Sequence, residues 1–119
     1  MFIDSHCHIN FPELRDNIKT ILENMNDNKI TNALCVSVTL DDFPGVLELA
    51  DRYDNIFASV GVHPDYEDIN EPSVDQLLAL AQHTNVVAIG ETGLDYFRLK
   101  GDLSWQRERF KTHIRSAIK

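Results

Sequence analysis

The sequence contains little cysteine, no long apolar run and fewer basic than acidic residues. Its two cysteines are too few for the disulfide framework that staples small secreted domains, so we expect Cys7 and Cys35 to be reduced thiols. No apolar run is long enough to cross a bilayer, and residues 1–4 contain neither a basic region nor a long apolar core. These absences predict a cytoplasmic protein that does not bind a membrane.

The chain also lacks a Gly-rich phosphate loop, a GxSxG sequence and a CxxC pair. Nucleotide-binding, serine-hydrolase and thioredoxin-like functions therefore have no support. The formal charge is -8, with 11 Lys and Arg against 19 Asp and Glu. This balance disfavours nucleic-acid binding through a broad basic surface, because that mode depends on cations that release counterions from phosphates. A divalent cation held by acidic groups would suit such a chain, although solubility alone explains the charge.

Four short apolar runs alternate with stretches of helical spacing, a pattern that predicts repeated βα units around a parallel sheet. The runs occupy residues 2–5, 33–38, 57–62 and 86–89. The length allows one ordinary core, and the apolar and charged fractions are those of a globular protein. We therefore expect a single domain over residues 1–119.

Each apolar run is followed by signals that begin a helix. Asp42 is the expected N-cap of the second helix, and Ser73 with Gln76 has the form of a capping box for the third. The fourth helix is expected from Ser104 and meets no stop signal before Lys119. Apolar stripes predict one packed face in the first helix (Leu14, Ile18, Ile21, Leu22 and Met25) and one in the fourth (Phe110, Ile114, Ala117 and Ile118).

Polar side chains directly follow the first, third and fourth apolar runs, at His8, His63 and Glu91. Strand order alone would allow either a doubly wound sheet or a barrel. Polar groups at the carboxyl ends of several strands are typical of the active face of a (β/α)8 barrel, which needs about 250 residues. We therefore expect an α/β fold that is the first half of a (β/α)8 TIM-type barrel. It would have four βα units with parallel strands and would end within the fourth helix.

The segment DSHCH after the first apolar residues predicts a metal site. Alternate side chains of an extended strand share a face, so Asp4, His6 and His8 project to one side and Cys7 to the other. Two imidazoles on one face can ligate the same ion, and Asp4 can orient an imidazole. A pair of ordinary surface or core histidines is the alternative for so short a motif. Cys7 is expected to be a buried structural thiol rather than a ligand.

Glu91 follows the fourth run within the segment GETGLDY. A carboxylate that ends a buried strand is destabilising unless it is paired or bound to metal, and one carboxylate can join two cations. A salt bridge to Arg98 or Lys100 is the alternative for Glu91. Asp95 is a candidate catalytic base or orienting group and Tyr96 a candidate substrate contact, while helix-capping or packing roles stay open for both.

The other three histidines have different surroundings. His63 precedes Pro64, which restricts the backbone and could aim the imidazole toward the same edge as Glu91. It is a candidate contact for substrate or phosphate, with a structural hydrogen bond as the alternative. His83 near the end of the third helix is expected to be structural, and His113 is expected on the surface of the fourth.

Taken together, these segments resemble the TatD family of metal-dependent hydrolases and deoxyribonucleases, within the amidohydrolase-like barrels. FIDSHCH, GVHP, GETGLDY and a QR pair entering the last helix follow the family's order and approximate spacing over the whole chain. The resemblance implies that His6, His8 and Glu91 ligate divalent metal ions, with Glu91 bridging two of them. Zinc, manganese or magnesium would suit these ligands. The family's later ligands, two histidines and an aspartate, would lie beyond Lys119.

The function implied by the resemblance is hydrolysis of phosphodiester bonds, with DNA as the substrate, by water activated between two metal ions. For residues 1–119 alone we expect an inactive half-barrel with a partial metal site, whose open strand edges favour self-association. A barrel phosphoesterase or amidohydrolase that acts on small molecules is a third possibility, because it shares the His-x-His opening.

Overall fold

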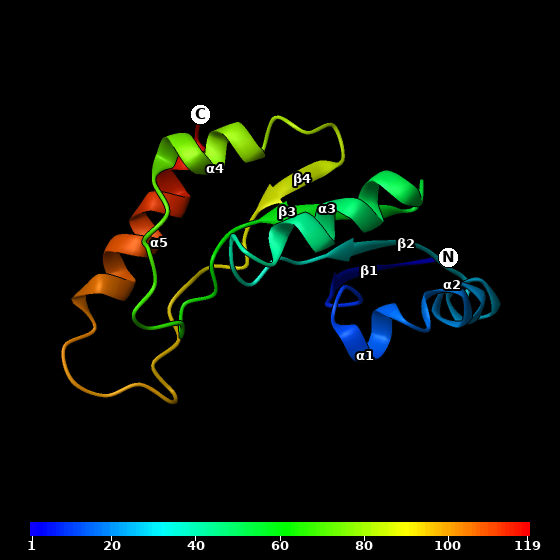
Figure 1. The fold of residues 1–119 in the computed structure, drawn as a ribbon, viewed down its shortest axis with the longest axis horizontal. Helices are drawn as coiled ribbons and strands as arrows, with labels where there is room; N and C mark the ends of the chain where they lie inside the picture. Colours follow the sequence, from blue (N-terminus) through cyan, green and yellow to red (C-terminus); the bar gives the residue numbers. More distant parts are fainter.

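The computed structural model describes residues 1–119 as a succession of βα units (Figure 1). The strands are β1 (Phe2–Cys7), β2 (Ile30–Cys35), β3 (Ile56–Val60) and β4 (Val86–Ile89). The helices are α1 (Pro12–Arg15), α2 (Ile18–Asp27), α3 (Phe43–Arg52), α4 (Val74–Leu80) and α5 (Ser104–Ala117). None of these helices is long and apolar enough to cross a membrane.

The four strands form one parallel sheet in the order β1-β2-β3-β4, which confirms the expected α/β fold built from βα units. β4 coincides with the predicted run 86–89, but β2 begins at Ile30 and ends at Cys35, ahead of the run predicted at 33–38. Residues 36–38 stay largely buried after β2 has ended, so apolar sequence there indicates burial rather than strand pairing. Because all the strands are parallel, their carboxyl ends lie at one edge of the sheet.

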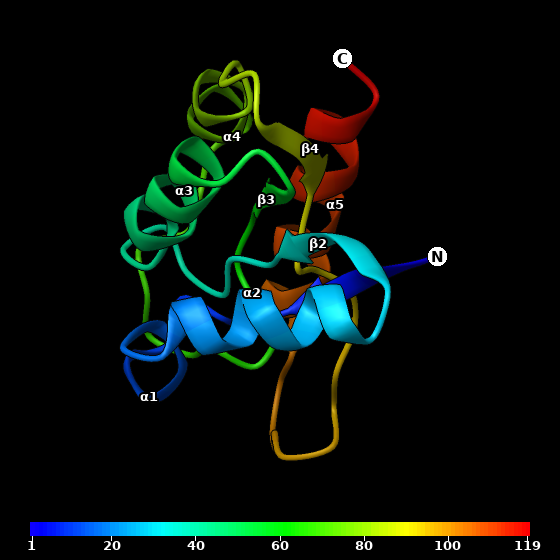
Figure 2. The same cartoon turned by 90° about the vertical axis from the view of Figure 1, so that its right-hand side faces the viewer.

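Helices α2, α3 and α4 pack along one side of the sheet (Figure 2). The larger core cluster joins α2 and α3 to β2 and β3, and comprises Ile9, Met25, Ala33, Cys35, Val46, Leu49, Ala50, Ile56 and Ala58. A smaller cluster joins α3, β3 and α4 through Phe43, Val60 and Leu77. These contacts pack the inner strands against the helices and so support the loops that follow them.

The two edge strands carry exposed apolar side chains. Phe2 and Ile3 in β1 are 65% and 67% exposed, and Val87 in β4 is 58% exposed. Edge strands present unpaired backbone groups that favour pairing with another chain. Self-association through these edges stays a prediction.

Both predicted N-cap positions are confirmed, but only the cap of α4 forms side-chain hydrogen bonds. Ser73 Oγ accepts a hydrogen bond from the Gln76 N–H at 3.1 Å, and the Ser73 N–H donates to Gln76 Oε1 at 2.9 Å, which confirms the capping box. Asp42 is the N-cap residue of α3, as predicted, but its side chain does not cap the helix, because its carboxylate accepts from the Asn10 side chain and the Val38 N–H instead. Asp42 therefore ties the loop after β1 to the loop after β2.

The apolar stripes predict the packed helix faces only in part. The first predicted helix is divided into α1 and α2, and Leu14 is 41% exposed. In α5 the apolar stripe lies largely outside, with Ile114 46% and Ile118 77% exposed. The buried side chains of α5 are all polar: Gln106, Arg109, His113 and Ser116. This happens because α5 packs over backbone of residues 62–66, whose N–H and C=O groups need polar partners.

His113 shows most clearly why polar side chains of α5 are buried. The prediction that it lies on the surface is wrong, since it is 1% exposed. Its Nε2 accepts from the Val62 N–H at 2.9 Å, and its Nδ1 donates to the Arg109 carbonyl at 2.8 Å. Burial lowers the pKa of His113 below its ordinary value, and the positive charge of Arg109 acts in the same direction while Glu71 opposes it. A second ring proton would break the bond to Val62.

This arrangement predicts a loss of stability in mild acid. Below about pH 6.5 the unfolded chain binds a proton that folded His113 does not accept, so the free energy of unfolding should fall as the pH drops. His113→Gln removes the titrating group and should flatten this part of the dependence. Urea denaturation of both proteins at about pH 7.5 and about pH 5.5 measures the difference. Equal losses in the two proteins would contradict the assignment to His113.

Candidate metal centre

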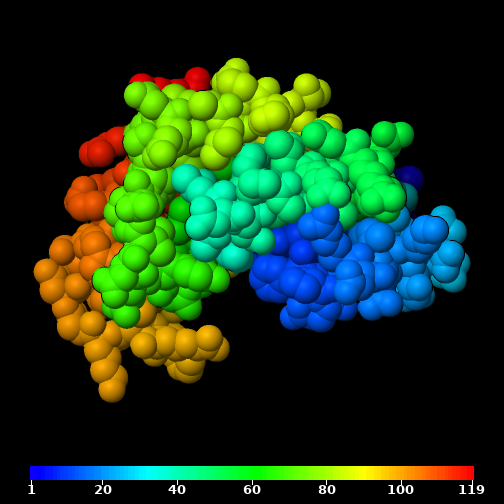
Figure 3. Space-filling model, viewed as in Figure 1, coloured from blue at the N-terminus to red at the C-terminus, as the bar shows by residue number.

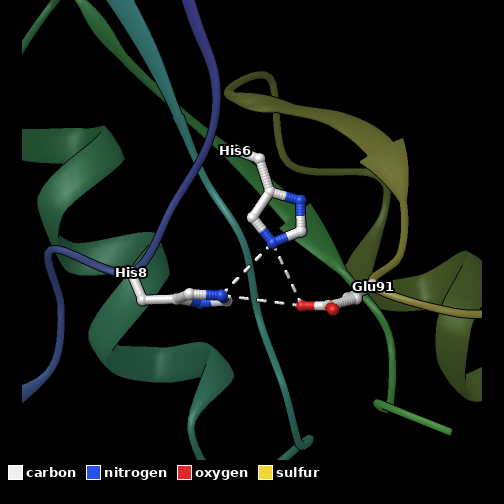
Figure 4. A group of neighbouring side chains, drawn as sticks. All are labelled: His6, His8 and Glu91. Atoms are coloured by element: carbon white, nitrogen blue, oxygen red, sulfur yellow. Dashed lines mark hydrogen bonds and ion pairs between the residues drawn. The ribbon is translucent and has the colours of Figure 1, made fainter.

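Three side chains from the two ends of the sequence meet at the carboxyl edge of the sheet (Figure 4). His6 lies in β1, His8 directly follows that strand, and Glu91 lies just after β4. His6 Nε2 and His8 Nε2 are 3.2 Å apart, and Glu91 Oε2 is 3.3 Å from the first and 3.6 Å from the second. The three atoms therefore face a common point.

These separations suit three ligands of one tetrahedral ion. With metal–ligand bonds of about 2.0–2.1 Å, ligands on a tetrahedron lie about 3.3–3.4 Å apart. Glu91 Oε2 is also buried without a hydrogen-bond partner, an unfavourable state for a carboxylate oxygen that a cation would relieve. Two imidazoles and a carboxylate are donors that zinc and manganese accept. The residues present thus fit a divalent metal ion.

His8 is oriented by a backbone group of the neighbouring strand. Its Nδ1 lies 2.9 Å from the Val36 carbonyl, to which the ring N–H donates, and this leaves the lone pair of Nε2 facing the cluster. The ring also stacks on Phe11, with centroids 5.1 Å apart and planes 13° apart. The parallel pairing of β1 with β2 therefore sets both the tautomer and the direction of this imidazole.

Asp4 and Cys7 lie beside the histidines without joining their side chains. Asp4 Oδ1 accepts from the backbone N–H of His6 at 3.1 Å, so it supports the backbone rather than the ring. Cys7 Sγ donates to the Leu34 carbonyl at 3.3 Å and packs against the core. Cys7 is half-buried rather than fully buried, but its sulfur packs against the core and away from the histidine rings.

Backbone hydrogen bonds to residues at and just after the ends of β3 and β2 position Glu91. Its N–H donates to the Ser37 carbonyl at 3.1 Å, and the Gly90 N–H donates to the Val60 carbonyl at 2.9 Å. Ser59 Oγ donates to the Gly90 carbonyl at 2.6 Å. Ser37 and Ser59 are both buried, so they are polar core residues that hold this turn.

The strands β3 and β4 approach very closely at Gly61, just after β3 ends. A Cβ atom there would lie 2.6, 2.7 and 2.8 Å from the carbonyl carbon, Cα and oxygen of Gly90. Only glycine fits such a contact without moving backbone. Gly61 thus determines how near the residue before Glu91 comes to the end of β3.

His63 connects Glu91 to a second acidic residue. Its Nε2 is 3.2 Å from Glu91 Oε1, and its Nδ1 is 2.6 Å from Asp65 Oδ1. The other oxygen of Glu91 is the one that faces His6 and His8. His63 therefore reaches the cluster expected from the sequence, and Asp65 is an additional partner that its spacing two residues after a histidine could have indicated.

The alternative salt bridge for Glu91 does not form. The basic groups that lie beside the Glu91 carboxylate are the rings of His6, His8 and His63, and neither Arg98 nor Lys100 forms a salt bridge with it. Asp95 Oδ1 accepts from the Phe97 N–H at 3.0 Å, and Tyr96 is 45% exposed. Neither belongs to the group of His6, His8 and Glu91 that could hold a metal ion. The catalytic role of Asp95 and the substrate contact of Tyr96 therefore stay predictions.

An open pocket of about 230 Å³ lies over the cluster and is lined by His8, Phe11, Val38, His63, Asp65, Tyr66 and Glu91. Its walls come from the loops that follow β1, β2, β3 and β4. It combines ring faces with imidazole and carboxylate groups, which suits a small polar group held beside flat, apolar surfaces.

Two residues of α5 that sequence reasoning did not single out as functional hold these loops together. Gln106 Nε2 donates to the carbonyls of Pro64 and Asp95 at 3.1 and 2.7 Å, and its Oε1 accepts from the Asp95 N–H at 2.9 Å. Arg109 donates to the His63 carbonyl at 2.9 Å and forms a two-pronged ion pair with Glu71. A signal was present, because polar residues 106, 109, 113 and 116 share one helix face.

Comparison with known proteins identifies a family that this chain matches over nearly its whole length. Residues 3–119 match the family model described as TatD related DNase. An uncharacterized metal-dependent hydrolase of Buchnera aphidicola subsp. Baizongia pistaciae is 33% identical over 98% of this chain and 45% of its own length. The crystal structure of YjjV, a TatD homologue from Escherichia coli K12, has a TM-score of 0.84 and 30% identity over 98% of this chain and 46% of that one.

A third relative is named for its activity. The protein described as 3'-5' ssDNA/RNA exonuclease TatD from Cronobacter sakazakii is 35% identical over 74% of this chain and 34% of its own length. The chain thus spans less than half the length of each of these relatives.

Proposed function

This chain belongs to the TatD-related DNase family of metal-dependent hydrolases, and on that basis we propose that its His6, His8 and Glu91 are metal ligands of a phosphodiesterase. The observation that carries the proposal is the convergence of two imidazole nitrogens on the buried, unpartnered Oε2 of Glu91. The two imidazole nitrogens lie near this oxygen without a hydrogen bond to it, and a cation among the three atoms would satisfy all of them.

A divalent cation, when bound, polarises phosphate oxygens and makes water more acidic. We propose zinc, manganese or magnesium for this role, with two ions in the whole protein and Glu91 shared between them. Glu91 would hold the metal together with His6 and His8, whose ring nitrogens lie beside its Oε2, while His63 lies beside its Oε1.

We propose that the remaining residues contact the substrate or take part in proton transfer. His63, held by Asp65 and close to Glu91, would contact a phosphate oxygen in the pocket. Asp95 is the proposed second catalytic carboxylate and Tyr96 a proposed substrate contact. Asp4 supports the site indirectly through the backbone of His6.

DNA is the proposed substrate of the whole protein, in keeping with the family description and the name of the Cronobacter relative. The matched Buchnera relative is about twice as long as this chain, since the match covers 45% of that relative. We therefore propose that residues 1–119 by themselves bind metal without rapid hydrolysis. A small phosphate ester is the competing substrate, because the pocket of about 230 Å³ would also accept one.

Metal titration of the purified chain tests the proposed ligands. Wild type should bind zinc or manganese, and His6→Ala should weaken binding by at least about tenfold because one of three ligands is removed. His83→Ala removes an exposed histidine away from the cluster and should bind like wild type. Calorimetric titration gives the dissociation constants. Equal affinity of wild type and His6→Ala would refute the assignment.

A test of the substrate uses a chimera in which residues 1–119 replace the matching part of YjjV. It should cleave a single-stranded DNA oligonucleotide only with added divalent metal, and a chelator should stop the reaction. Cleavage of bis(p-nitrophenyl) phosphate without any cleavage of DNA would instead favour the small-ester function.

A further inference from the structure

The two cysteines of the chain lie opposite each other at the carboxyl ends of neighbouring strands. Cys7 is the last residue of β1 and Cys35 the last residue of β2, and they are direct partners in the parallel pairing of these strands. Both are free thiols in this structure. Neighbouring strands lie about 4.8 Å apart, and the Cα atoms that a disulfide joins lie about 4.4–6.8 Å apart. The backbone therefore places the two cysteines at the separation that a disulfide needs.

The side chains of the two cysteines lie on the same side of the sheet. Cys35 belongs to the larger core cluster, and Cys7 packs against that cluster. The thiols are close enough to affect one another, because the hydrogen bond with Cys7, followed by burial, raises the pKa of Cys35 above its ordinary value. Cys35 is fully buried, whereas Cys7 is half-buried. A small oxidant therefore reaches Cys7 first, and Cys35 lies beside it as the second thiol.

Hydrogen bonds hold the two strand ends together around this pair. The Val36 N–H donates to the Cys7 carbonyl at 2.8 Å. Asn10 accepts from the Cys35 thiol at 3.3 Å and donates to Asp42, which ties the chain after β1 to the chain after β2. The space-filling view shows these parts in contact, where the blue atoms of the N-terminal segment meet cyan and green ones (Figure 3). The two cysteines are thus kept opposite each other.

The pair lies next to the proposed metal ligands along both strands. Cys7 lies between His6 and His8 in the sequence, with its sulfur packed against the core. Cys35 directly precedes Val36, whose carbonyl accepts from Nδ1 of His8 at 2.9 Å. A bond between the two sulfurs would therefore join the residues that come immediately before each partner in the hydrogen bond that orients His8.

We propose that Cys7 and Cys35 form a reversible disulfide that weakens metal binding by His6, His8 and Glu91. The effect on metal binding rests on the proposed function, whereas the disulfide itself does not. Sulfur atoms in a disulfide are about 2.05 Å apart, closer than two unbonded thiols approach. Forming the bond must therefore draw the end of β1 toward β2 and move the histidines on either side of Cys7.

The expected direction of the effect follows from the reduced structure. In the reduced form the three ligand atoms already lie 3.2, 3.3 and 3.6 Å from one another, which suits a single metal ion. A displacement of His6 and His8 relative to Glu91 lengthens or misdirects at least one metal bond. The oxidised protein should therefore bind metal less tightly than the reduced protein.

Hydrogen peroxide is the proposed oxidant, and the reaction has two steps. The Cys7 sulfur attacks one peroxide oxygen, the O–O bond breaks, and Cys7 becomes a sulfenic acid while water leaves. The Cys35 sulfur then attacks the Cys7 sulfur, the S–O bond breaks, and a second water leaves with the proton of the Cys35 thiol. The two thiols together give up two protons and two electrons, and one peroxide is reduced to two waters. A phosphine or an external thiol reverses the oxidation.

The test compares the full wild-type chain in two redox states, so its main result does not depend on a variant that must fold. The chain is treated with hydrogen peroxide in the presence of a chelator. Mass spectrometry should show the loss of two hydrogens and a bond that links tryptic peptides 1–15 and 30–52. Non-reducing electrophoresis should show that the product stays monomeric.

Metal affinity is measured after the chelator and peroxide have been removed. Manganese is the probe, because it prefers nitrogen and oxygen donors to thiols. Calorimetric titration should give a dissociation constant about tenfold higher for the oxidised than for the reduced protein. Treatment with tris(2-carboxyethyl)phosphine should restore both the thiols and the affinity.

The Cys7→Ala/Cys35→Ala variant is the matched control. It keeps both methionines and all five histidines, so it reports any effect of peroxide on those side chains. Peroxide should leave its manganese affinity unchanged. The reversal of the wild-type effect by phosphine is a second control, since methionine sulfoxide is restored by dedicated reductases.

Two results would overturn the proposal. One is that the cysteines stay reduced, take up oxygen singly or link different molecules. The other is that the disulfide forms within the chain while manganese affinity stays the same. Failure of the proposed function gives a different pattern, in which neither redox state binds manganese although the disulfide still appears in the mass spectrum.

Discussion

Glu91→Gln is expected to abolish tight metal binding, raising the dissociation constant for zinc or manganese by at least about a hundredfold. Glu91 supplies the only negative charge among the three grouped side chains, and its Oε2 faces His6 and His8 at 3.3 and 3.6 Å. A neutral amide keeps nearly the same shape but offers a weaker donor to a divalent ion. Calorimetric titration at neutral pH measures this change.

The same substitution should leave the metal-free protein at least as stable as wild type. Glu91 Oε2 is buried without a hydrogen-bond partner, and removing an unsatisfied charge relieves a desolvation penalty on the order of 1 kcal/mol. If Glu91→Gln loses metal affinity while its stability is unchanged or higher, the loss comes from the missing metal-binding carboxylate and not from unfolding. Residues that a binding site needs for its function commonly lower the stability of the folded protein in this way.

Glu67→Gln provides the control, because Glu67 is an exposed carboxylate on the loop after β3 and forms no ion pair with the cluster. It should bind metal like wild type. If Glu91→Gln bound zinc within about threefold of Glu67→Gln, the carboxylate would not be a ligand and the proposed centre would fail.

Gly61→Ala should damage the site without touching any of its ligands. The added Cβ would meet three backbone atoms of Gly90 at 2.6 to 2.8 Å, so β3 and the residue before Glu91 must separate. We expect a loss of about 3 kcal/mol in the free energy of unfolding, as for other overpacked backbone contacts. Because Glu91 moves with Gly90, metal affinity should also fall, by about tenfold or more.

Gly45→Ala is the matched substitution. Gly45 lies in α3, and a Cβ there meets only the Arg15 guanidinium at 3.7 Å, an ordinary contact. Alanine in a helix should be neutral or stabilising by up to about 1 kcal/mol. Urea denaturation and metal titration of both variants separate the two sites. The close approach of β3 to β4 would be without consequence if both alanine variants unfolded at the same urea concentration.

Much of the architecture was predictable because it depends on short-range pattern. The run 86–89 matches β4, and Ser73 with Gln76 forms the predicted capping box, since strand periodicity and capping involve residues close in sequence. The meeting of His6, His8 and Glu91 was predictable for a different reason. Parallel strands end at one edge, so polar residues that follow several strands are brought together.

Other features depend on contacts that local pattern does not record. The Val36 carbonyl orients His8 only because β1 pairs with β2 in one particular register. The apolar stripe of α5 predicted the wrong buried face, because polar side chains were needed against the backbone of residues 62–66. A hydrophobic pattern counts apolar burial and cannot show where backbone groups require partners.

By itself the sequence determined that βα units repeat, that their strands are parallel, and that histidines and a glutamate follow those strands. Only the tertiary structure decided that Glu91 keeps one oxygen for His63 and leaves the other unpartnered between His6 and His8. The physical reason is that the interactions involved act over different separations along the sequence. Alternation and helical spacing act over a few residues, whereas the direction of each ligand is set by hydrogen bonds and close contacts between strands distant in sequence.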